Sequence, residues 1–75
     1  MKRMTESNAS EDQLRALEFI KDFIFSNGYS PSMHEIAVAM NWKSDSTAYD
    51  AVNGLVKHGY VRKEKFKPRT ITVIR

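Results

Sequence analysis

The sequence contains no cysteine, only two prolines and three glycines, and no long apolar run. The lack of cysteine excludes disulfides, thiol catalysis and cysteine-ligated zinc sites, and it is consistent with a reducing compartment such as the cytoplasm. A membrane-spanning helix needs about 20 consecutive apolar residues. No stretch of the sequence comes near this length, so we expect no segment that spans a membrane and no membrane partner through such a segment.

The composition is that of one small folded domain. Of the 75 residues, 41% are hydrophobic and 28% are charged, and such values are typical of globular rather than disordered chains. Lys2 and Arg3 have no apolar stretch behind them, so the start of the chain is not a secretory signal peptide. We predict a flexible tail over residues 1–9 and a single domain over residues 10–75.

Charge is distributed unevenly along the chain. The net charge is +3, but residues 1–40 hold four Lys/Arg and six Asp/Glu, whereas residues 41–75 hold eight and three. A basic half of this kind favours a polyanionic partner, either a nucleic acid or an anionic membrane surface. The alternative is an ordinary solvated surface, so the position of the charges has to decide.

The first predicted helix covers residues 11–26. Ser10 is a helix cap, and Gln13 completes a capping box by reaching back to it. Asn27 and Gly28 provide a left-handed stop. Apolar residues recur at spacings of three and four, so we expect them in the core. These positions are Leu14, Leu17, Ile20, Phe23 and Ile24. The other aromatic residues of this helix, Phe19 and Phe25, are also expected in the core rather than in a binding site.

The second predicted helix covers residues 33–40 and repeats this pattern. Ser32 and Glu35 form another capping box, and Asn41 stands where a left-handed residue ends the helix. Its buried positions are Ile36, Ala37 and Met40.

The third predicted helix covers residues 45–58, between a cap at Ser44 and a stop at Gly59. Its expected inward residues are Ala48, Val52, Leu55 and Val56. Gly54 inside the helix is unfavourable, and close packing is one explanation for it. Trp42 in the preceding turn is expected to pack under the helices rather than to stack on a base.

The rest of the chain changes to a strand pattern. Residues 60–65 combine strand propensity with charge, and residues 70–75 are rich in β-branched residues. Pro68 lies in the turn between them. The order is therefore helix, helix, short turn, helix and basic hairpin. This order predicts an α+β fold, a winged helix-turn-helix of three helices followed by a two-stranded β-hairpin wing.

One motif adds a resemblance to a known family. The second helix and its turn read Pro31-Ser32-x-x-Glu35-Ile36-Ala37-x-x-Met40-Asn41-Trp42-Lys43-Ser44. This motif resembles the helix-turn-helix of the LexA repressor N-terminal DNA-binding domain family. The resemblance covers about residues 10–75. It implies a winged helix-turn-helix that binds double-stranded DNA as a transcriptional repressor, and we expect a bacterial cytoplasmic setting at the nucleoid. Because the sequence is short, we expect either a phage or mobile-element regulator or a fragment of a longer repressor.

Two departures limit what the resemblance implies. Such repressors carry a second domain that dimerises and cleaves itself with a serine–lysine pair, and nothing in this sequence corresponds to it. The family also commonly has proline and asparagine after the capping serine, where this chain has Asp45 and Ser46. The operator of the family therefore does not carry over.

The candidate contacts with DNA fall into two groups. Exposed polar positions of the third helix are the candidates for base edges, since Asn can pair with adenine and Asp can accept from cytosine: Ser46, Thr47, Tyr49, Asp50 and Asn53. The candidates for the DNA backbone are Lys43, Ser44, Lys63, Lys65, Lys67 and Arg69. The alternative for the helix residues is that they are exposed without contacting DNA. The alternative for the hairpin lysines is that they protect strand edges against aggregation.

No constellation of catalytic or metal-binding residues accompanies these candidates. His34 and His58 are separated and lack companion ligands, and the serines lack a paired base. We therefore expect no enzyme, metal or cofactor. The acids on the third helix keep one alternative open, a protein-interaction module on the same fold, such as an anti-repressor. Useful DNA affinity would require a homodimer or a partner protein.

Overall fold

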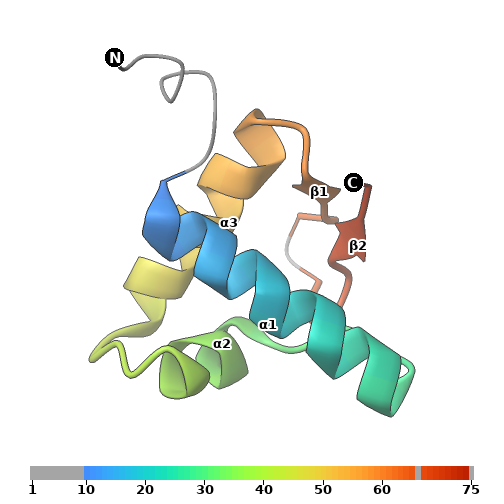
Figure 1. Cartoon of the computed structure of the whole chain (residues 1–75), viewed down its shortest axis with the longest axis horizontal. Coiled ribbons are helices and arrows are strands. Elements are labelled where there is room, and N and C mark those ends of the chain that lie inside the picture. Colours follow the sequence, from blue (N-terminus) through green and yellow to red (C-terminus); the bar gives the residue numbers. More distant parts are fainter. Residues whose placement is uncertain (1–9, 66, 75) are drawn as a thin grey trace.

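Three helices and a small antiparallel sheet make up the fold (Figure 1). The computed structural model describes residues 10–65 and 67–74, so the predicted tail over residues 1–9 lies outside the described residues. The elements are α1 (Glu11–Asn27), α2 (Met33–Ala39), α3 (Asp45–Lys57), β1 (Val61–Arg62) and β2 (Thr72–Val73). The predicted α+β winged helix-turn-helix is confirmed, and each helix ends within one residue of its predicted limit.

Local signals set the helix ends as the sequence predicted. The hydroxyl of Ser10 accepts from the backbone N–H of Gln13 at 3.3 Å, and the Gln13 side chain accepts from the Ser10 N–H at 3.1 Å. Gly28 (φ 82°) and Asn41 (φ 63°) adopt the left-handed conformation that ends α1 and α2. Within the part of the chain that the structure describes, no helix is long and apolar enough to cross a membrane.

The core lies where the three helices meet the sheet, and its residues are Ala16, Leu17, Ile20, Ile36, Ala37, Ala48, Val52, Leu55, Val61 and Ile71. Trp42 packs against this cluster, as predicted. The assignment of Leu14 and Val56 to the core was wrong, since each is 38% exposed, and so was that of Phe25, which is 90% exposed. Ala16 on α1 and Ala51 on α3 are also buried. Their small side chains permit a close approach between the helices.

Gly54 explains part of that close approach. A Cβ added at this position would overlap the amide group of the Gln13 side chain on α1. The same Gln13 side chain closes the capping box with Ser10. Close packing is therefore the explanation for Gly54, because a glycine lets α3 approach the capped start of α1.

The wing consists of β1, β2 and the loop that joins them. Val61 is paired with Val73 and Arg62 with Thr72 in antiparallel register, and the Ile74 N–H donates to the Tyr60 carbonyl at 2.7 Å. The strands are much shorter than the predicted residues 60–65 and 70–75. The Thr70 hydroxyl is the reason, because it accepts from the Glu64 N–H at 3.0 Å and donates to the Lys67 carbonyl at 3.0 Å, replacing ladder bonds.

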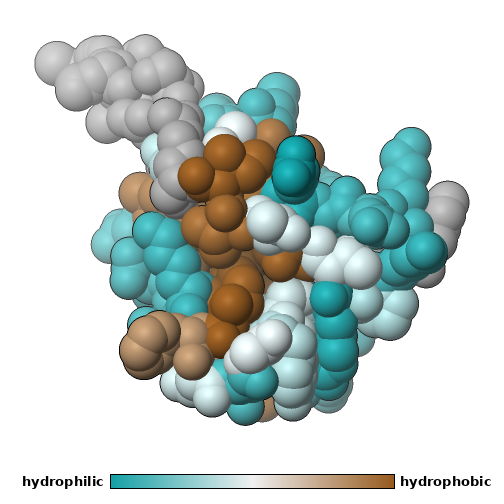
Figure 2. All heavy atoms as spheres, turned by 90° about the vertical axis from the view of Figure 1, so that its right-hand side faces the viewer, coloured by the Kyte–Doolittle hydropathy of each residue, from teal (hydrophilic) through white to brown (hydrophobic). Residues whose placement is uncertain are grey.

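An apolar surface lies on the wing side of the molecule. Figure 2 shows a band of apolar side chains there, flanked by polar ones. Ile24, Phe25, Ile71 and Val73 line a shallow groove between α1 and β2, and Ile74 is 54% exposed. An exposed apolar surface of this kind is typical of contact with another molecule.

Candidate nucleic-acid interface

A groove with many charged side chains in its lining opens between the start of α2, the exposed face of α3 and the wing. Its charged and polar lining comprises Ser32, His34, Asp45, Tyr49, Asn53, Lys63, Glu64, Lys65, Lys67, Arg69 and Thr70. Four of these side chains are cationic and two are carboxylates, so cationic side chains outnumber anionic ones in the lining of the groove. The basic half of the sequence is thus concentrated beside the exposed face of α3, which is the arrangement expected for a polyanion.

All five residues predicted to contact base edges are exposed. Ser46, Asp50 and Asn53 follow one another at spacings of four and three, on the face of α3 opposite the buried Ala48 and Leu55. Tyr49, which is 49% exposed, borders this face and lines the groove together with Asn53. Thr47 lies on the other flank of the exposed face.

The start of α3 offers donors to an anion. The Ser44 hydroxyl accepts from the Ser46 N–H at 3.0 Å and lies 2.6 Å from the Ser46 hydroxyl. The N-terminus of a 13-residue helix carries partial positive charge, and Lys43 beside it is exposed. Two hydroxyls, a lysine and a helix terminus are the groups that bind phosphate in known complexes.

One pair in the groove was missed by sequence reasoning. His34 Nδ1 lies 2.9 Å from Asp45 Oδ1 and links the start of α2 to the start of α3. A carboxylate can only accept, so Nδ1 carries the hydrogen in this bond. No local signal joins two residues that are 11 positions apart.

The wing lysines differ in whether they have an ionic partner. Neither Lys63 nor Lys65, nor Lys43 in the turn, forms an ion pair with a carboxylate of the described residues. Lys67 lies 3.6 Å from Glu64, with both side chains about two-thirds exposed. Exposed pairs of this kind contribute about 0–1 kcal/mol, so a phosphate can replace Glu64 with little loss.

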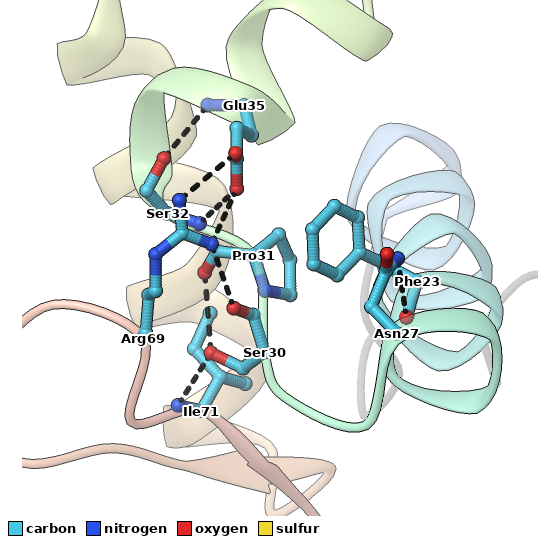
Figure 3. Close-up of polar contacts among 8 residues, drawn as sticks. All are labelled: Phe23, Asn27, Ser30, Pro31, Ser32, Glu35, Arg69 and Ile71. Atoms are coloured by element: carbon cyan, nitrogen blue, oxygen red, sulfur yellow. Dashed lines mark hydrogen bonds and ion pairs between the residues drawn. The ribbon is translucent and has the colours of Figure 1, made fainter.

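Arg69 differs from these lysines, although the sequence grouped it with them. Its guanidinium donates to both carboxylate oxygens of Glu35 at 2.9 Å and to the Ser30 carbonyl at 3.3 Å (Figure 3). It also lies 5.2 Å from the centre of the Tyr29 ring. The hydrogen bonds from Arg69, aided by the Ser32 backbone N–H, lower the pKa of Glu35, and the hydrogen bond to Glu35 raises the pKa of Arg69.

Comparison with known proteins agrees with this architecture. The chain matches the family described as "LexA DNA binding domain" over residues 3–70. It is 45% identical over 65 residues to the LexA repressor of Clostridioides difficile (strain 630), covering 87% of this chain and 31% of that protein. The LexA repressor of Acetivibrio thermocellus is 38% identical over 69 residues, which cover 92% of this chain and 32% of the relative.

The relatives are much longer than this sequence. The chain spans about a third of the length of the curated relatives that it matches. The family match over residues 3–70 contains the three helices and β1, and it ends two residues before β2. From the family match, the identities and the three-helix and wing architecture together, the chain belongs to the LexA DNA-binding domain family.

Proposed function

We propose that this chain binds double-stranded DNA in a sequence-specific manner and represses transcription. The observation that carries the proposal is the groove in which the exposed face of α3 faces the cationic wing. An α-helix fits the major groove of B-DNA, and a basic wing at its side can follow the backbone or enter the minor groove. Membership of the LexA DNA-binding domain family supports the same function.

The proposed contacts divide into positioning and base-reading groups. Phosphates would be held by Lys43, by Ser44 at the start of α3, and by the wing lysines Lys63, Lys65 and Lys67. These contacts carry affinity, with a strong dependence on salt. Base edges would be contacted from α3 by the amide of Asn53, the carboxylate of Asp50, and the polar groups of Ser46, Thr47 and Tyr49.

The proposed assembly follows from the small size of the interface, and the proposed setting follows from the relatives. One winged helix covers little DNA, so we propose that two copies, or one copy and a partner protein, occupy a palindromic site. We propose a bacterial cytoplasmic setting, by analogy with the bacterial relatives. The proposed role is purely one of binding, without catalysis.

Selection of binding duplexes from a random pool tests the function. Fluorescence anisotropy on the selected duplex, measured at several salt concentrations, should give a logarithmic affinity that falls linearly with the logarithm of salt. A palindromic consensus would support pairing of two copies. Failure to bind any duplex at low salt, or binding that does not depend on salt, would contradict the proposal.

The second candidate is a protein-interaction module on the same fold. The exposed Phe25 and the apolar groove between α1 and β2 favour it, because these groups are typical of protein contacts. The acids Asp45 and Asp50 on α3 are also compatible with it. The same titration decides, since such a module would give no salt-dependent DNA binding.

A further inference from the structure

We infer that Arg69 is a positioning residue: it holds the wing against the start of α2, through Glu35, and does not itself contact a DNA phosphate. The inference rests on the proposed DNA-binding function and assigns Arg69 a role different from that of its neighbours in the wing. Three observations carry it: the geometry of the Arg69 contacts, the backbone at Arg69, and a second attachment at Ser30.

The first observation is that three of the five guanidinium N–H groups of Arg69 donate to acceptors of the protein. Two nitrogens of the guanidinium donate to the two oxygens of Glu35, each at 2.9 Å, and one of them also reaches the Ser30 carbonyl (Figure 3). The planar guanidinium matches a carboxylate in this two-bonded arrangement, which fixes orientation as well as distance. The Tyr29 ring covers it from another side.

The second observation is the backbone conformation. Arg69 has a φ of 58°, a left-handed conformation that side chains bearing a Cβ rarely adopt. Such a conformation persists where surrounding contacts compensate for it. Here the turn at Arg69 directs the side chain back to α2 instead of outward with Lys67.

The third observation is a second attachment two residues later. The Ser30 hydroxyl accepts from the Ile71 N–H at 3.2 Å and donates to the Pro31 carbonyl at 3.2 Å, and both Ser30 and Ile71 are buried. Arg69 and Ile71 are thus both tied to the segment that precedes α2. Thr70 between them closes the wing loop on Glu64 and Lys67. The position of the wing lysines relative to α3 therefore depends on this attachment.

Charge balance argues against a transfer of Arg69 to DNA. Glu35 is held in place by the capping box, where it accepts from the Ser32 N–H at 2.9 Å. If Arg69 moved to a phosphate, the Glu35 carboxylate would remain beside the DNA backbone, and like charges at that distance oppose binding. The lysines of the wing can supply phosphate contacts without this loss.

Four variants test the role: Glu35→Gln, Arg69→Gln, Arg69→Lys and the double variant Glu35→Gln/Arg69→Gln. If Arg69 acts through Glu35, each single variant should weaken DNA binding by roughly tenfold, and the double variant should be no weaker than the singles. Arg69→Lys should behave like Arg69→Gln, because lysine cannot form the two-bonded pair. The dependence of affinity on salt should keep the slope of the unaltered protein, since no phosphate contact is lost.

The opposite pattern would overturn the inference. If Arg69 contacts a phosphate, Glu35→Gln should leave affinity unchanged or increase it, Arg69→Lys should retain binding, and Arg69→Gln should reduce the salt slope by about 0.9. Lys67→Gln is the matched control from the same loop, for which a reduced slope is expected. Circular dichroism on each variant verifies folding.

A readout without DNA separates this inference from the proposed function. Hydrogen exchange at the Ile71 amide should be faster in Glu35→Gln and Arg69→Gln and unchanged in Lys67→Gln. Unchanged exchange in all three would overturn the positioning role even if the protein binds DNA. Faster exchange together with no DNA binding by the unaltered protein would place the failure in the proposed function.

Discussion

The N-termini of α2 and α3 have the same type of capping residue but different further contacts. Each helix follows a serine in extended conformation, Ser32 with φ −81° and Ser44 with φ −138°. At α2, Glu35 reaches back to the Ser32 N–H, and Arg69 covers the Glu35 carboxylate. At α3 the corresponding third residue is Thr47, and the cap bonds to the Ser46 N–H within an exposed pair of hydroxyls.

This difference separates the supporting helix from the helix proposed to contact DNA. The start of α2 is covered by groups of the chain itself: Glu35 lies 3 residues after Ser32, and Arg69 lies 34 residues after Glu35. The start of α3 keeps exposed hydroxyls and an exposed Lys43 beside a positive helix end. The same local signal therefore stabilises the fold at one helix and leaves donors for a ligand at the other.

The largest expected effect tests whether the cationic side of the groove carries affinity. Replacing Lys63, Lys65 and Lys67 together with glutamine should weaken binding to all duplexes by at least about 100-fold at low salt, because each lost phosphate contact reduces the salt slope by about 0.9. Anisotropy titrations at several salt concentrations measure both quantities. Lys21→Gln, on α1 away from this groove, is the control. Equal losses in the control and the triple variant would contradict the assignment.

The next effect tests the exposed face of α3. Asp50→Ala and Asn53→Ala should each change the preferred base at one position of the site, with a discrimination of about 1–3 kcal/mol removed. Selection from a random pool gives the preference, and the salt slope should stay constant. A binding-site logo identical to that of the unaltered protein would show that the substituted residue does not contact a base.

The two serine caps offer a direct comparison of the helix starts. Ser32→Ala and Ser44→Ala should each lower the free energy of unfolding by about 1 kcal/mol. Only Ser44→Ala should also remove a phosphate contact and weaken DNA binding beyond its effect on folding. Urea denaturation measures stability, and anisotropy at a temperature where both variants are folded measures binding. Equal affinities of the two variants would remove the distinction.

The smallest effect concerns acid pH. The pKa of Glu35 is lowered in the folded protein, chiefly by the hydrogen bonds from Arg69. Its ionisation therefore stabilises the fold above the ordinary pKa of a glutamate, about 4.3, and this contribution is lost as pH falls through the lower folded value. Urea denaturation of Glu35→Gln should show a deficit against the unaltered protein at neutral pH that shrinks toward pH 3. A deficit that does not change with pH would show that the pairing is not the cause.

Most of the fold was predictable because its signals are local. The caps at Ser10, Ser32 and Ser44 and the left-handed residues act within three or four positions, so their residue types alone fix the helix limits. The strands were predicted too long, because β propensity does not account for the Thr70 side chain, which takes over backbone hydrogen bonds of the loop. Core membership erred at Phe25, where helical spacing alone does not specify which flank is covered.

The sequence by itself determined the order of the elements, the helix limits and the basic character of the wing, since each depends on neighbouring residues. Only the tertiary structure decided which charged groups pair. Glu35 and Arg69 are 34 residues apart, and His34 and Asp45 are 11 apart. The sequence offered several acids and bases as possible ion-pair partners without distinguishing among them. The packing of the wing against α2 brought one arginine to one glutamate. That contact distinguishes Arg69 from the lysines with which its charge alone had grouped it.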